Sequence, residues 1–175
     1  MPCGLPNPSA WRLNEAAMNK FHLVYLNLGS NIQPETNLPK ALKLLRDLGE
    51  VQQVSSVWES EAVGTTGPNY LNVCVKFKST FSQAALKEKV VRTIELELGR
   101  IRRADKFAPR TIDIDIVIFD DGFSNQKSWG LAYVIVPLAE IYPDYRNPET
   151  RETVSEIAMR LRQEVWLETR PGVLG

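Results

Sequence analysis

The chain has 175 residues and a mass of 19.8 kDa, with 21 basic residues, 21 acidic residues, one His and two Cys. That length suits one domain with its own core, and zero net charge argues against a general nucleic-acid binder, which carries a basic excess. No apolar run approaches the roughly 20 residues of a membrane helix, and so few His and Cys residues exclude a multi-histidine metal site and a disulfide framework. We therefore expect a cytoplasmic protein.

The first half of the chain predicts two strands around a helix. Residues 1–20 contain no apolar core run and form an N-terminal extension that can be disordered. Residues 22–28 are an apolar strand that ends at a Gly-Ser-Asn turn. Leucines at helical spacing predict a helix that begins near Asn37 and ends at Gly49. The β-prone segment 51–58 predicts a second strand.

The second half repeats this pattern. Residues 70–78 alternate between apolar and polar side chains, as in a strand that faces a core on one side. Ser82 suits the N-cap of a helix that ends at Gly99. Residues 111–119 alternate again and place four isoleucines toward the core: Ile112, Ile114, Ile116 and Ile118.

The order of elements predicts an α+β fold. A short apolar stretch over 133–141 and a helix over 152–162 follow the last strand. The order is that of a ferredoxin-like βαββαβ sandwich, in which helices cover one face of the sheet, with a C-terminal helical extension. We expect one domain over residues 21–165 and a tail over residues 166–175.

The most informative segment runs from Arg100 to Asp115. Five cations lie within its first 11 residues, and Asp113 and Asp115 follow. Two residues apart in a strand, these aspartates lie on one face with Cα atoms roughly 7 Å apart. Oxygen ligands favour Mg²⁺, and adjacent arginines suit phosphoryl chemistry. Alternatively, the aspartates line an exposed strand face beside a solvated basic loop.

Two polar residues follow each other on the non-core side of the strand over 70–78. The Tyr70 ring could stack on a flat heterocycle while the Asn72 amide reads its edge. Alternatively, Tyr70 merely covers the surface of the sheet.

Four segments together resemble a known family. They are residues 25–31 (YLNLGSN), 67–72 (GPNYLN), 95–100 (ELELGR) and 108–115 (APRTIDID). The chain resembles the 6-hydroxymethyl-7,8-dihydropterin pyrophosphokinases of folate biosynthesis over about residues 21 to 145. The resemblance implies a ferredoxin-like fold and transfer of pyrophosphate from ATP to the hydroxymethyl oxygen of the pterin, which leaves AMP.

The resemblance also implies roles for individual residues. Asp113 and Asp115 match aspartates that bridge two Mg²⁺ ions, and Arg100 and Arg110 match arginines that engage the phosphates. The other positions matching the ATP site are Glu95, Arg102 and Ile116. The positions matching the pterin pocket are Ser60, Val63, Tyr70, Asn72 and Tyr133.

The chain also departs from the family. Phe107 stands where a Trp is usual, and the segment 120–136 is short and lacks the usual His and Arg. Tyr133 aligns with a stacking Phe and Leu131 with the missing Arg, for which Lys127 could substitute in part. These losses leave a catalytically impaired pterin- or nucleotide-binding relative as an alternative. A ferredoxin-like regulatory module is a third hypothesis, against which the intact aspartate pair counts.

Overall fold

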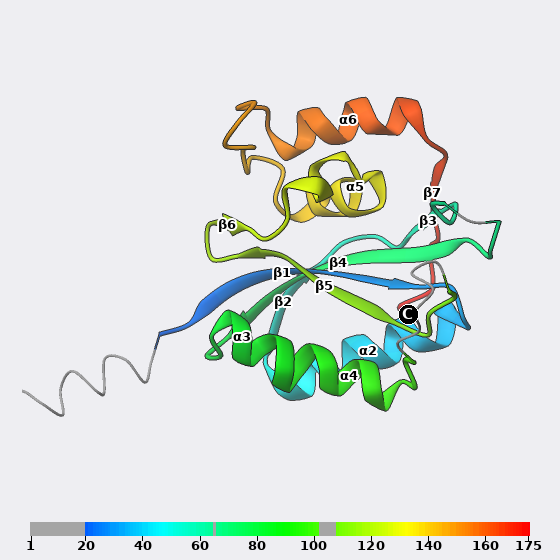
Figure 1. Cartoon of the computed structure of the whole chain (residues 1–175), viewed down its shortest axis with the longest axis vertical. Helices are drawn as coiled ribbons and strands as arrows, with labels where there is room; N and C mark the ends of the chain where they lie inside the picture. Colours follow the sequence, from blue (N-terminus) through cyan, green and yellow to red (C-terminus); the bar gives the residue numbers. More distant parts are fainter. Residues whose placement is uncertain (1–19, 65, 102–107) are drawn as a thin grey trace, which may run out of the picture.

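A computed structural model describes residues 20–64, 66–101 and 108–175, and it contains a seven-stranded sheet between two layers of helices (Figure 1). The strands are β1 (His22–Ser30), β2 (Glu50–Val54), β3 (Trp58–Ser60), β4 (Tyr70–Ser79), β5 (Asp113–Phe119), β6 (Gly122–Phe123) and β7 (Leu167–Thr169). They run antiparallel in the order β6-β5-β1-β4-β3-β7, and β2 also pairs with β4. The predicted α+β sandwich is confirmed.

One layer of helices is the predicted one. It contains α2 (Pro34–Leu48), α3 (Gln83–Leu86), a π-helical turn η1 (Lys87–Val91) and α4 (Arg92–Glu97). The last three form one continuous helical segment, and Ser82 caps it by accepting a hydrogen bond from the Ala85 N–H, as predicted. The fully buried residues that join this layer to the sheet include Leu38, Leu45, Val73, Phe77, Leu86 and Ile94.

A second layer covers the opposite face of the sheet, so the prediction that helices cover one face is wrong. It contains the 3₁₀ turn η2 (Gln126–Gly130), α5 (Ala132–Ile141) and α6 (Val154–Glu164). α5 is apolar on nearly every side because it lies between the sheet and α6. A helix that is apolar all round has no amphipathic period, which explains why the sequence showed only an apolar stretch.

Two predicted boundaries are wrong near the start of the domain. β1 continues through the expected Gly-Ser turn, because Gly29 pairs with Asn72 on one side and Asp113 on the other. The turn comes later, at Gln33, and α2 begins at Pro34 rather than near Asn37. Proline suits this first helical position because its missing N–H has no partner there in any helix.

Two predicted strands also differ in detail. The segment 51–58 divides into β2 and β3, and Ser55 between them holds β4 through its side chain, which accepts from the Cys74 N–H at 2.9 Å. In β5 the pairing with β1 shifts register between Tyr25 and Leu26. This bulge turns Ile118 toward the second layer, so only the other three isoleucines face the predicted core.

Within the described part of the chain, no helix is both long enough and apolar enough to cross a membrane.

Candidate active site

The two aspartates lie on one face of β5, at the end of the sheet where β1 and β4 bring further polar groups. Asp113 pairs across the strands with Gly29, and Asp115 pairs with Asn27. Gly29 has no side chain, and a Cβ atom built there would lie 3.0 Å from the Asn72 Oδ1. This glycine therefore leaves an opening in the sheet face, with an amide on one side and the carboxylates on the other.

Arginines hold Asp113 from two directions. Arg100, which follows α4, donates to one carboxylate oxygen of Asp113, and Arg110 donates to the other. Arg100 also donates to Glu95, which is only 3% exposed and accepts from the Ile114 N–H at 3.2 Å. The loop after α4 thus places two of the predicted arginines against the predicted aspartate.

The backbone of Arg110 is fixed by Asn31. The Asn31 Oδ1 accepts from the Arg110 N–H at 2.7 Å, and the Arg110 carbonyl accepts from the Asn31 N–H at 3.1 Å. The Asn31 amide also donates to the Pro68 carbonyl at 3.2 Å. Asn31 therefore joins the start of β5 to the loop before β4, a role that the sequence did not reveal.

The surroundings of Asp115 disfavour its ionised form. Burial in the cleft and the neighbouring Asp113 charge raise the pKa of Asp115 to about 6, although Arg100 and Arg110 oppose this shift. The carboxylate remains open to the cleft. A bound cation would stabilise the ionised form of Asp115, which its surroundings disfavour. The pair of aspartates therefore fits a divalent ion that prefers oxygen ligands.

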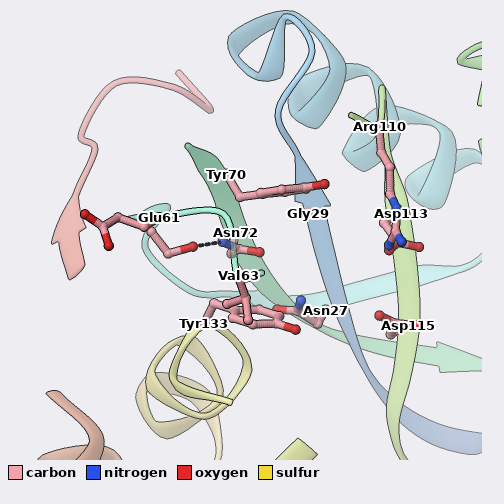
Figure 2. A pocket seen from close by; sticks show the side chains of 11 residues that line it. Asn27, Gly29, Glu61, Val63, Tyr70, Asn72, Arg110, Asp113, Asp115 and Tyr133 are labelled. Atoms are coloured by element: carbon pink, nitrogen blue, oxygen red, sulfur yellow. Dashed lines mark hydrogen bonds and ion pairs between the residues drawn. The ribbon is translucent and has the colours of Figure 1, made fainter. Parts of the chain in front are cut away.

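A smaller cavity of about 230 Å³ brings together all the predicted pterin residues (Figure 2). Tyr70 from β4 and Tyr133 from α5 lie on opposite sides of it, and burial raises the pKa of both phenols, so both rings are neutral. The Asn72 amide donates to the Ser60 hydroxyl at 3.1 Å, and Val63 is exposed at the rim. Two flat rings and an amide suit a planar heterocycle.

A larger cavity of about 760 Å³ lies on the other side of the carboxylates. Its lining includes the predicted nucleotide residues Glu95, Arg100 and Ile116. The π-helical turn η1 adds Lys87 and Val91 to this lining. Asp113 and Asp115 line both cavities, so they form the wall where two ligands could meet.

Some sequence predictions lie outside this geometry. Arg102 and Phe107 fall outside the described residues. Leu131, which the sequence resemblance aligns with an Arg, precedes α5 and packs against the apolar cluster of the second layer. Two further residues, Asn27 and Glu61, line the smaller cavity but were missed. Asn27 had a signal, because it is polar within an otherwise apolar strand.

Comparisons with known proteins agree with this arrangement. Residues 25–143 match the family model for 7,8-dihydro-6-hydroxymethylpterin-pyrophosphokinase (HPPK). The 2-amino-4-hydroxy-6-hydroxymethyldihydropteridine pyrophosphokinase of Synechocystis is 33% identical over 78% of this chain and 74% of its own length. The protein of that name from Aquifex aeolicus is 33% identical over 76% of this chain and 88% of its own.

The fold matches as well. A solved HPPK-DHPS structure from Plasmodium falciparum superposes with a TM-score of 0.66 at 13% identity, over 83% of this chain and 47% of that one. The family model covers most of the described domain, including the strands and loops that build both cavities. The chain belongs to the 7,8-dihydro-6-hydroxymethylpterin-pyrophosphokinase family.

Proposed function

We propose that this protein transfers pyrophosphate from ATP to 6-hydroxymethyl-7,8-dihydropterin, giving AMP and the pterin diphosphate for folate synthesis. The observation that carries the proposal is the wall shared by the two cavities, formed by Asp113 and Asp115. The larger cavity suits the nucleotide and the smaller one suits the pterin. The reacting groups then meet at the carboxylates and the two arginines.

The bonds that change follow from this arrangement. The hydroxymethyl oxygen forms a bond to the β-phosphorus of ATP, and the bond between that phosphorus and the oxygen bridging it to the α-phosphorus breaks. AMP leaves with the bridging oxygen, and the hydroxyl proton is released. Because phosphoryl transfer depends mainly on position and charge, the task of this chain is to hold two substrates in line.

Asp113 and Asp115 are the residues that would hold Mg²⁺, and we infer two ions between them and the ATP phosphates. Two carboxylates with substrate phosphates are a common ligand set for this ion. Bound Mg²⁺ neutralises phosphate charge and polarises the oxygens of the transferred group. In the structure Asp113 is held by Arg100 and Arg110. We infer that both guanidinium groups turn toward the phosphates when these occupy the site.

The other assignments follow the two cavities. Glu95 and Ile116 line the larger cavity and belong to the proposed ATP site, in which Glu95 orients Arg100. Arg102 lies outside the described residues and is assigned to this site from the sequence resemblance alone. Ser60, Val63, Tyr70, Asn72 and Tyr133 belong to the proposed pterin site. Tyr70 and Tyr133 would stack on the two sides of the heterocycle, and Asn72 would hydrogen-bond its edge.

A coupled assay of AMP release with ATP, Mg²⁺ and the dihydropterin tests this proposal. We expect turnover by the wild type and a loss of at least about 100-fold in kcat for Asp113→Ala. Asp47→Ala, an exposed position on α2, serves as the matched control and should keep the wild-type rate. Absence of AMP release by the wild type, or full activity of Asp113→Ala, would contradict the proposal.

A further inference from the structure

Asn27 is buried in the smaller cavity without a complete set of hydrogen bonds. Its side chain lies in the middle of β1 and is 4% exposed. Among the residues that the structure describes, none donates to its Oδ1, which solvent does not reach. Burying an amide oxygen without a donor costs free energy, whereas an apolar side chain of the same shape would not incur that cost. The fold alone therefore gives no reason for an amide at this position.

The position of Asn27 suggests what the amide is for. Across the sheet it stands between Cys74 on β4 and Asp115 on β5. The next residue on the same face of β1 is Gly29, at the opening beside Asn72. Figure 2 shows Asn27 between the Tyr133 ring and Asp115. Asn27 thus lies where the space for a heterocycle meets the carboxylates.

The chemistry of the substrate identifies the group that reaches this point. A pterin held at its far edge by Asn72 extends its hydroxymethyl group toward the aspartates. The ring atoms next to that group are N5, which accepts hydrogen bonds, and the C7 methylene, which does not take part in them. The hydroxyl is therefore the group at this end that can donate to an amide oxygen, and it can also accept from the amide nitrogen.

We propose, as an extension of the proposed function, that Asn27 is a positioning residue that hydrogen-bonds the hydroxymethyl group of the pterin. Because solvent does not reach the Oδ1 in the structure, the amide would turn about its Cβ–Cγ bond as the substrate enters. The substrate then supplies the partner that the protein does not. The bond would direct the nucleophilic oxygen toward the Asp113 and Asp115 end of the cavity. An amide suits this task because either of its orientations can pair with a hydroxyl.

The test compares two ligands that differ only in the hydroxyl, 6-hydroxymethyl-7,8-dihydropterin and 6-methyl-7,8-dihydropterin. Their affinities are measured by calorimetry with Mg²⁺ and α,β-methylene ATP, which does not react. The wild type should prefer the hydroxymethyl ligand by about three- to tenfold, the range expected of one hydrogen bond. Asn27→Leu, with the same number of side-chain heavy atoms, and Asn27→Ala should bind both ligands equally.

Asn72→Ala is the matched control. It removes a proposed contact to the ring edge that both ligands share, so it should weaken both and keep the preference for the hydroxyl. Asn27→Leu should also melt no lower than the wild type, because it removes an unpaired buried oxygen. If Asn27→Leu does not fold, Asn27→Ala decides the question.

The outcomes separate this inference from the proposed function. A wild-type preference that persists in both Asn27 variants would overturn the role of Asn27, even if AMP release is normal. A wild type that binds the hydroxymethyl ligand but releases no AMP would contradict the proposed activity, while loss of the preference in the variants would still support the role of Asn27.

Discussion

At the scale of single residues, the titration of Asp115 links pH to metal binding. Its pKa of about 6 results from burial and from the Asp113 charge, and Mg²⁺ binds only the ionised form. We predict that the affinity for Mg²⁺ with α,β-methylene ATP falls as pH drops below about 6, approaching about tenfold per pH unit. Calorimetry between pH 5 and 7.5 measures this decline.

Asp115→Asn provides the comparison for that measurement. This variant should bind Mg²⁺ more weakly at pH 7.5, and its affinity should decline less near pH 6, because only the nucleotide phosphate then still takes up a proton. Proton release on binding, seen as a dependence of the heat on the buffer, should decrease by the share that Asp115 contributes. An identical pH profile in wild type and variant would assign the titration to another group.

Glu95 is the buried partner of Arg100 at the junction of α4 and β5. Removing it leaves the largely buried guanidinium of Arg100 and the Ile114 N–H without that acceptor. We predict that Glu95→Ala lowers the free energy of unfolding by about 2–3 kcal/mol in urea titrations. Glu95→Gln should lose less, because its amide oxygen still accepts.

An exposed pair on the same helical segment is the control for Glu95. Glu88 pairs with Arg92 one turn apart at 2.6 Å, with both side chains about half exposed. Glu88→Ala should change the free energy of unfolding by no more than about 0.5 kcal/mol. Equal losses at Glu88 and Glu95 would show that burial does not govern the Glu95 interaction.

At the scale of elements, sequence patterns predicted those helices and strands that depend on residues close together in the chain. β4 and the segment from Ser82 were predicted well because alternation and capping depend on neighbouring residues. α5 was not, because its helical state comes from burial between two layers. The same contrast holds in the site. Asp113 and Asp115 could be paired from the sequence because they are two residues apart, whereas Tyr133 reaches the cavity only through the packing of α5.

The connection from α2 to β2 depends on a glycine in contact with the core. A Cβ atom at Gly49 would lie 2.3 Å from the ring of Phe77, which is fully buried and has no room to move. We predict that Gly49→Ala destabilises the protein by about 1–3 kcal/mol, measured by thermal unfolding. Gly130→Ala, where nothing lies within 4 Å, should stay within about 0.5 kcal/mol of the wild type. A neutral Gly49→Ala would mean that the α2–β2 turn shifts freely.

At the scale of the whole molecule, the sheet separates two apolar clusters, and the site lies at the sheet end where residues from both layers meet. α4 and the loop after it supply Glu95 and Arg100 from one side, and α5 supplies Tyr133 from the other. Neither layer alone completes the two cavities. The geometry of the site therefore depends on contacts that hold the layers on a common sheet.

The last ten residues make such contacts. After α6 on one face of the sheet, β7 pairs with β3, and Val173 and Leu174 then pack against the apolar cluster on the other face. Arg170 donates to Glu59 at 2.5 Å, and its N–H donates to the Val57 carbonyl at 2.8 Å. This segment thus supports β3, which ends at Ser60 in the smaller cavity.

Removal of residues 166–175 tests whether this segment is a dispensable tail, as the division of the chain into 21–165 and 166–175 implies. Because apolar contacts and the pairing with β3 are lost, we predict a drop of about 2–4 kcal/mol in the free energy of unfolding. The dissociation constant for the pterin should rise more than that for the ATP analogue, since β3 borders only the smaller cavity. Arg170→Met keeps the strand pairing and should show a smaller loss. Wild-type stability and pterin binding in the truncated protein would show that β3 holds its position without β7.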